Sequence, residues 1–296
     1  MAVVTEGLAA PAQRSRSPTW LRIKDALRRH PTALLGALML LLLILMALLA
    51  PVLGTVDPLA ISPIRRLREP SEMYWFGTDM LGRDVYSRVV YGARVSLAVG
   101  LSVAVLATAS GLAIGLVTGF LRWLDGIVMR IMDGLMSIPG VLLAIALIAL
   151  TKASLANVII AITVTETPRV VRLVRSLVLS LREQPYVEAA IAAGTRIPRI
   201  LVRHILPNTV APLLVQGTYI CASAMLTEAI LSFLGAGTPP NIPSWGNIMA
   251  EARSLFQIAN YLIFFPGLFL SLAVLSVNLL GDGLRDALDP RLARNM

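Results

Sequence analysis

Residues 95–121 read VSLAVGLSVAVLATASGLAIGLVTGFL and contain no charged side chain. A bilayer hydrocarbon core is crossed by roughly 20 consecutive apolar residues in a helix. This stretch therefore predicts a transmembrane helix, and it sets the class of protein to which the rest of the chain belongs.

The composition of the whole chain agrees with a membrane protein. Its 296 residues are 56% hydrophobic and only 15% charged, with a mean hydropathy of +0.76, far more apolar than a soluble domain. The net charge of +9 does not indicate a nucleic-acid partner, because the basic residues are scattered and no basic patch with interleaved aromatics is present. One cysteine and two histidines exclude an intrachain disulfide and a Cys/His metal cluster, so no metal or cofactor is expected.

The spacing of apolar runs predicts an all-α polytopic protein with six transmembrane helices. Five runs carry no charge, and a sixth begins at Ala153 and continues helically through Val178 if Glu166 and the following arginines are tolerated. The first run is too long for the apolar core of a cleaved signal peptide, so we interpret it as a span. The five uncharged runs are residues 32–53, 95–121, 134–151, 209–227 and 254–281.

Basic residues predict the orientation. With six spans, 18 of the 26 Lys and Arg lie on the side of both termini and 8 on the other, which favours N-in and C-in. The expected organisation is a cytoplasmic tail with a short amphipathic helix near residues 20–29, a first span, an outer loop, a five-helix core and a C-terminal tail. The corresponding ranges are 1–31, 32–53, 54–94, 95–281 and 282–296, with a cytoplasmic loop at about 182–207 and an outer loop at about 235–253.

The cytoplasmic loop contains YVEAAIAAGTRIPRILVRHILPN at residues 186–208. Pro185 suits the first turn of a helix, Gly194 permits a turn after it, and a second helical piece is expected from Pro198 to a stop at Pro207. Alanines make one face narrow enough for close approach by another protein, and arginines surround it. The segment is either a docking surface or an amphipathic connector lying on the membrane.

The outer segment WFGTDMLGRDVYSRVVYGARVSLAVG occupies residues 75–100. Its Gly-Thr-Asp sequence predicts a turn and a helix cap at Thr78 and Asp79. Val85, Val89 and Gly92 follow on one side, with the arginines elsewhere, which predicts an interfacial helix along the membrane surface.

These motifs resemble those of a known family. Glu188, Ala189, Ala190, Gly194, Leu206 and Pro207 match the coupling motif of ABC-transporter permeases, although His204 stands where that motif has a hydrophobic residue. The outer segment resembles the signature of the dipeptide, oligopeptide and nickel branch, in the C-type of its two membrane subunits, through Gly77, Thr78, Asp79, Gly82, Arg83 and Asp84. Residues 231–249 and 281–292 also match, so the resemblance covers about residues 75–292.

The resemblance implies a type I importer permease fold in the cytoplasmic membrane and transport of peptides, or alternatively of nickel or glutathione. It implies a heterodimer with a second permease, two ATPase subunits or domains, and an extracytoplasmic binding protein. The residues that the resemblance places against the ATPase are Glu188, Ala189, Ala190, Gly194, Arg196, Leu206 and Pro207.

The chain has no phosphate-binding loop, because neither Lys24 nor Lys152 lies in a G-x-x-x-x-G-K-[ST] sequence. We expect ATP and Mg²⁺ to be used by partner subunits and this chain to perform no covalent chemistry. A membrane-embedded enzyme would need a metal motif or a nucleophile with a base. A secondary transporter would show inverted repeats with broken helices, and no such repeat is visible in the sequence.

Charged residues near or within spans are costly when they face lipid. We hypothesise that Glu228, Glu166 and Asp133 border the translocation path, where a carboxylate can meet the amino group of a peptide. The alternative is that they pair with Arg169, Arg172 or another subunit and hold helices together. The glycines at 111, 115 and 119 similarly serve either helix packing or a pore.

Overall fold

The computed structural model describes residues 31–288, so the amphipathic helix expected near residues 20–29 lies outside the described residues. Within that range the fold is helical, and Thr78 and Asp84 form one isolated β-bridge. The long helices are α2 (Pro31–Leu48), α3 (Val85–Phe120), α4 (Arg122–Met136), α5 (Gly140–Ala149), α6 (Leu155–Arg182), α9 (Leu206–Phe233) and α11 (Tyr261–Leu288). Shorter elements are η1 (Ala50–Val52), η2 (Pro63–Arg65), α7 (Pro185–Ala192), α8 (Ile197–Ile200), the π-helical η3 (Leu201–Ile205), α10 (Trp245–Glu251) and η4 (Arg253–Leu255).

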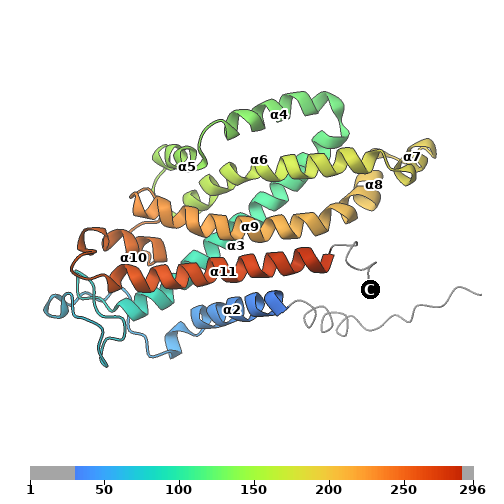
Figure 1. Cartoon of the computed structure of the whole chain (residues 1–296). Helices are drawn as coiled ribbons and strands as arrows, with labels where there is room; N and C mark the ends of the chain where they lie inside the picture. Colours follow the sequence, from blue (N-terminus) through green and yellow to red (C-terminus); the bar gives the residue numbers. More distant parts are fainter. Residues whose placement is uncertain (1–30, 289–296) are drawn as a thin grey trace, which may run out of the picture.

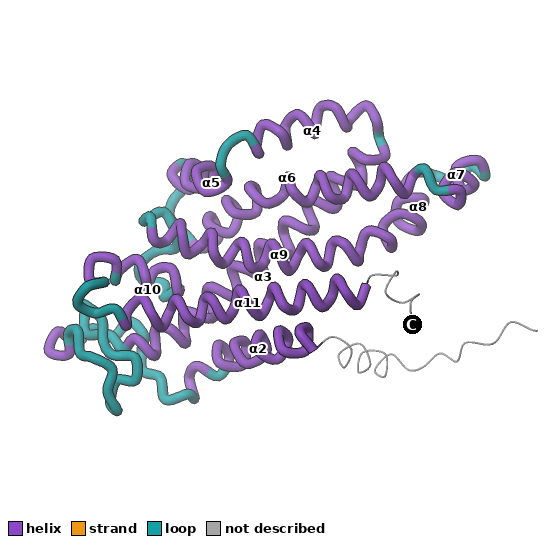
Figure 2. The backbone as a smooth tube through the Cα atoms, viewed as in Figure 1, coloured by secondary structure: helices purple, strands orange, loops and turns teal. Residues whose placement is uncertain are grey.

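The long helices form a bundle with two different ends. The 54–84 loop and α10 gather at one end, whereas α7, α8, the start of α2 and the end of α11 lie at the other (Figure 1). Figure 2 shows that most of the non-helical backbone collects at the α10 end. We call the α7 end the inner end and the α10 end the outer end, after the orientation predicted from the basic residues.

Length and hydropathy single out α2, α3, α11 and the 197–233 helix as four candidate membrane spans within residues 31–288, and the bent pair of α4 and α5 makes up to five. The predicted sixth span is the continuous helix α6, whose charged residues keep it outside that criterion. Its apolar side is buried at Val170, Val171, Val174 and Val178, and the side chains of Arg172 and Arg175 are 46% and 31% exposed. The arginines thus lie off the packed face, as predicted.

The predicted third span at residues 134–151 has the wrong bounds. The helix α4 begins at Arg122, in the expected loop, and the chain then breaks at Ser137–Pro139 and turns by 90° into α5. Proline disfavours helix in the residue before it and removes an N–H, and the ten residues of α5 reach only about 15 Å. Two ion pairs to α6, Asp125–Arg175 and Asp133–Arg172, hold α4 against the bundle.

The expected interfacial helix is also wrong as a separate element. Val85 already belongs to α3, which continues for 36 residues, so the boundary between residues 94 and 95 falls inside one helix. The cap is Asp84, which accepts hydrogen bonds from the backbone N–H and hydroxyl of Ser87 at 2.8 and 2.5 Å. A capped start and burial of the first turns, Arg88 included, draw this segment into the bundle.

The glycines of α3 allow close packing against α6. A Cβ atom at Gly111, Gly115 or Gly119 would lie 2.4–2.7 Å from the Cβ of a valine on α6. The valines are Val170, Val174 and Val178, which follow the same four-residue spacing. Helix packing is therefore what these glycines serve in the structure.

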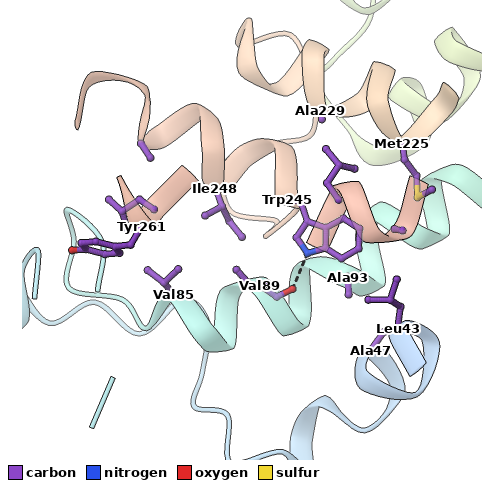
Figure 3. Packing of buried hydrophobic residues seen from close by; sticks show 14 of the residues in the cluster. Leu43, Ala47, Val85, Val89, Ala93, Met225, Ala229, Trp245, Ile248 and Tyr261 are labelled. Carbon is purple, nitrogen blue, oxygen red and sulfur yellow. Dashed lines mark hydrogen bonds between the residues drawn. The ribbon is translucent and has the colours of Figure 1, made fainter. Parts of the chain in front are cut away.

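The short helix α10 inserts its tryptophan between the long helices (Figure 3). Trp245 is fully buried, and its indole Nε1 donates to the carbonyl of Val89 at 3.0 Å. The same cluster contains Ala93 of α3, Met225 of α9 and Leu43 of α2. This satisfied, buried indole fixes α10 and the loop before it at one end of the bundle.

Candidate functional site

The predicted docking segment is an ordered helical hairpin at the inner end. Pro185 occupies the first turn of α7, and Val187 is fully buried and anchors the helix. Gly194 has φ +73°. The N–H of Thr195 donates to the carbonyl of Ala190 at 3.0 Å, and the N–H of Gly194 donates to the carbonyl of Ile191 at 2.9 Å. This is a Schellman motif, so Gly194 ends α7 as predicted.

The hairpin after the turn differs from the prediction. Helical backbone continues from α8 through η3 into α9, and Pro207 lies in the first turn of α9 instead of closing a separate helix. The wider π-helical turn at Leu201–Ile205 comes just before that proline. A proline is tolerated in the first turn of a helix, where its missing N–H breaks no helical hydrogen bond. His204 lies beside Tyr186, with ring centroids 6.2 Å apart, so the departure from the motif packs onto α7.

The hairpin presents a small-residue face beyond the bundle. It projects past the ends of α6 and α9 (Figure 1). Two large apolar residues of the hairpin, Tyr186 and Ile191, are 44% and 48% exposed, and both lie outside the apolar spans. Of the seven predicted coupling residues, Glu188, Ala189, Gly194, Arg196 and Pro207 are exposed, and Ala190 and Leu206 are half-buried.

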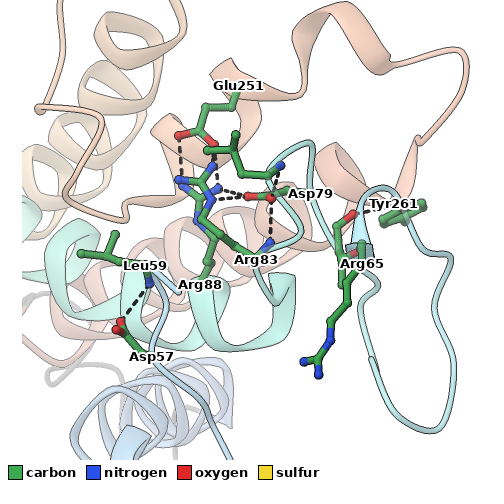
Figure 4. A network of polar contacts seen from close by, with 10 residues as sticks. Asp57, Leu59, Arg65, Asp79, Arg83, Arg88, Glu251 and Tyr261 are labelled. Atoms are coloured by element: carbon green, nitrogen blue, oxygen red, sulfur yellow. Dashed lines mark hydrogen bonds and ion pairs between the residues drawn. The ribbon is translucent and has the colours of Figure 1, made fainter. Parts of the chain in front are cut away.

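The signature segment at the outer end builds an ion network in which Asp79, Arg83 and Arg88 are buried and Glu251 is partly exposed (Figure 4). Asp79 accepts from Arg83 Nε at 2.6 Å and from Arg88 Nη1 at 2.7 Å. Glu251 of α10 accepts from Arg88 Nη1 at 2.6 Å and also pairs with Arg83. Glu251 was missed by the sequence reasoning, although it lies two residues after the matched motif at residues 231–249.

The remaining signature residues shape the loop around this network. Gly77 and Gly82 have φ of +76° and +73°, and a Cβ at Gly82 would lie 1.9 Å from the carbonyl oxygen of Ser62. Thr78 accepts from the N–H of Arg68 at 2.8 Å, and its carbonyl accepts from the hydroxyl of Tyr261 at 3.1 Å. The segment therefore joins the outer loop to α3, α10 and α11.

The three intramembrane carboxylates occupy separate contacts and are not paired with one another. Glu228 is fully buried, and its Oε1 accepts from the hydroxyls of Ser232, Ser244 and Thr238 at 2.8, 2.9 and 3.2 Å. Its Oε2 has no hydrogen-bond partner. This geometry ties α9 to the segment that leads into α10 and favours the helix-holding alternative for Glu228.

Asp133 and Glu166 both pair with arginines of α6. Asp133 Oδ1 lies 2.6 Å from Arg172 Nη2, at an exposed position. Glu166 Oε2 lies 3.1 Å from Arg169 Nη1, and its Oε1 accepts from the hydroxyl of Ser223 on α9 at 3.0 Å. Glu166 and Arg169 also border a cavity of about 260 Å³. Within residues 31–288 no group of three or more His, Cys, Asp or Glu is placed to hold a metal ion.

Comparison with protein families gives two matches. Residues 111–294 match the model of the binding-protein-dependent transport system inner membrane component, and residues 19–70 match the N-terminal transmembrane domain of oligopeptide transport permease C. The chain belongs to this family of transport permeases. It is a C-type subunit of the dipeptide and oligopeptide branch, a multi-pass inner-membrane protein and not an enzyme.

Relatives of this permease match it along nearly the whole chain. A protein of Sinorhizobium fredii that bears the name of a peptide ABC transporter permease is 56% identical over 98% of this chain and 99% of its own. A dipeptide transport system permease of Alkalihalophilus pseudofirmus is 42% identical over 92% and 90%. A glutathione transport system permease of Escherichia coli is 42% identical over 94% and 92%.

The fold of this permease resembles that of a solved importer. The inward-facing MetNI methionine ABC transporter matches with a TM-score of 0.55 and 20% identity, over 68% of this chain and 96% of the other. The match supports the type I importer fold that the motifs implied.

Proposed function

We propose that this permease is the membrane subunit of an ATP-driven importer that moves di- to oligopeptides across the cytoplasmic membrane. The relative with 56% identity carries a peptide transporter's name, and so does a relative with 42% identity. The relative named for glutathione keeps that tripeptide as the second candidate cargo. Nickel has no comparable support among these relatives.

The observation that carries the coupling role is the exposed α7 hairpin. An apolar surface that is exposed at the inner end, outside the spans, marks a protein contact. Val187 is buried in one cluster with Val178 of α6 and Ile205 just before α9, so displacement of α7 would be passed to both long helices. A packed connection of this kind suits transfer of motion from an ATPase.

The ATP cycle belongs to partners in this proposal. The chain lacks a phosphate-binding loop, so ATP and Mg²⁺ are bound by two ATPase subunits or domains, and this chain binds no cofactor. A second, homologous permease completes a heterodimer. An extracytoplasmic binding protein delivers the peptide to the outer end, where most of residues 54–73 and residues 234, 235, 240 and 241 are exposed.

Of the three carboxylates, we retain Glu166 as a residue of the translocation path. It lines a cavity of about 260 Å³ together with Arg169 and Thr227. Asp133 and Glu228 serve to hold helices together through Arg172 and the hydroxyl cluster.

The test is substrate-stimulated ATPase activity of the full complex with its binding protein, in nanodiscs. Glu188→Lys reverses a charge on the exposed face of α7 and should reduce stimulation by peptide at least about tenfold, the size of one lost charged contact. Asp286→Lys makes the same charge reversal at an exposed position in the last turn of α11 and should leave stimulation within about twofold. Normal peptide stimulation of the Glu188→Lys complex would show that the hairpin is only a connector. Stimulation by glutathione and by no other peptide would show that glutathione is the cargo.

A further inference from the structure

The cavity at the break between α4 and α5 lies on one side of the bundle, part-way along α6. Its lining includes Glu166 and Arg169 of α6, Gly140 and Val141 of α5, and Thr227 of α9. Glu166 is about 16 Å along α6 from its first residue, at 1.5 Å per residue. In a hydrocarbon core about 30 Å thick, that position is near the middle of the membrane.

The backbone beside the cavity needs a polar environment. Residues 137–139 are non-helical and exposed in this chain. Non-helical backbone at membrane depth is tolerated where it is covered by protein or faces water, and not against lipid. This side of the bundle therefore faces a water-filled passage or a partner subunit.

The charges in the cavity form one balanced pair. The Glu166 residue is 8% exposed, and its carboxylate is held by Arg169 and Ser223. The Arg169 side chain is 45% exposed and lies 5.3 Å from the ring centroid of Tyr219. The Arg169 guanidinium is thus accessible to solvent, whereas the Glu166 carboxylate is buried and held in place by its two hydrogen bonds.

The start of α5 adds a site that favours an anion. No side chain caps its N-terminus, and its first residues line the cavity. Uncapped N–H groups at a helix start favour negative charge. The cavity therefore offers a carboxylate for a cation, and a guanidinium with helix N–H groups for an anion.

We propose that this cavity recognises the two charged ends of a short peptide, with its ammonium on Glu166 and its carboxylate on Arg169 beside the α5 start. The proposal rests on the function proposed above and names the contact that the moving substrate makes. Ligand binding exchanges the internal ion pair for two pairs with the peptide, so the charge stays balanced in both states. Because the internal ion pair is lost when the peptide binds, the affinity of the cavity for the peptide stays low. A low affinity suits a translocation path, which must release its cargo.

The test measures direct binding to the complete complex in nanodiscs, without binding protein or nucleotide. The probes are Ala-Ala, N-acetyl-Ala-Ala and Ala-Ala amide, compared by equilibrium dialysis and saturation-transfer NMR. Each blocked form should bind about tenfold more weakly than Ala-Ala, because one charged hydrogen-bonded contact is lost. Equal binding of all three forms to the wild-type complex, or no binding of any, overturns the proposal.

Two variants assign the ends of the peptide. The Glu166→Gln complex should bind N-acetyl-Ala-Ala as well as Ala-Ala, and should still bind Ala-Ala amide more weakly. The Arg169→Gln complex should bind Ala-Ala amide as well as Ala-Ala, and should still bind N-acetyl-Ala-Ala more weakly. Glu72→Gln and Arg285→Gln remove the same charges at exposed sites and should keep both discriminations. A variant that loses both discriminations together shows a structural effect and contradicts the assignment.

Failure of this proposal differs from failure of the proposed function. ATPase stimulation by the loaded binding protein is measured on the same preparations. Stimulation without selective dipeptide binding overturns the cavity assignment alone. Absence of stimulation by any peptide overturns the function, whatever the dialysis shows.

Discussion

Arg88 is a fully buried arginine in the first turns of a long apolar helix. Its side chain is 1% exposed and contacts two carboxylates, Asp79 and Glu251. Two arginines and two carboxylates balance within the network, which offsets the cost of removing them from water. The network therefore depends on all four partners being present.

Arg88→Met should lower the free energy of unfolding by about 3 kcal/mol, because two carboxylates lose a buried counter-charge. Arg66→Met, at an exposed site whose guanidinium donates to the sulfur of Met80, should change it by less than about 0.5 kcal/mol. Denaturant unfolding of the purified complex gives both values. Equal stability of the two variants would show that the network contributes nothing.

The signature residues were recognised in the sequence, and their roles were not. Asp79 was expected in a turn before an interfacial helix, and Arg83 on the side of that segment away from Val85 and Val89. Glu251, which pairs with Arg83 and Arg88, lies 168 residues from Arg83, and no local pattern reports a contact at that separation. The coupling turn at Gly194 was predictable, because a helix followed by glycine is a local signal.

At the scale of elements, the contact between α3 and α6 depends on the absence of side chains. Gly115 faces Val174 and the carbonyl of Val171, whereas Gly126 of α4 has no atom within 4 Å of a built Cβ. The same substitution at these two helical glycines should therefore have opposite effects.

Gly115→Ala should destabilise the complex by about 1–3 kcal/mol through overpacking. Gly126→Ala should stabilise it by up to about 1 kcal/mol, because alanine is the better helix former. Thermal unfolding at matched lipid content measures both. Adding Val174→Ala should restore part of the loss at Gly115, and a destabilised Gly126→Ala would contradict the helix assigned to α4.

The apolar runs predicted four helices well and the third span poorly. Hydropathy placed a span at residues 134–151 because Asp125 and Arg130 looked like loop residues. Pairing of Asp125 with Arg175 keeps that segment helical beside α6, and Pro139 breaks the chain where hydropathy is continuous. Local apolarity was enough to predict which segments are helical. The position of the α4–α5 break depended on Pro139 and on the pairing of Asp125 with the distant Arg175.

At the scale of the whole molecule, the two ends of the bundle define the membrane sides. The α7 hairpin lies at one end, and the 54–84 loop and α10 lie at the other. Lys152, between α5 and α6, is exposed and belongs to the outer end if α4 and α5 together cross the membrane.

Cysteine labelling tests this topology in a Cys221→Ala background. Glu72→Cys and Lys152→Cys should react with an impermeant maleimide in intact cells, and Arg196→Cys only after permeabilisation. All three positions are exposed, so a failure to react reports the side of the membrane. Labelling of Lys152→Cys from the inside only would show that α4 and α5 do not cross.

The sequence by itself determined the membrane class, the apolar helices, the coupling turn and the family, since each follows from composition, local backbone preference or a short motif. Only the tertiary structure decided the α4–α5 break, the pairing of Arg83 and Arg88 with Glu251, the enclosure of Glu228 by three hydroxyls, and the cavity beside Glu166. These features depend on which side chains meet across long chain separations. Such meetings are set by packing of the whole bundle, and a local pattern does not contain them.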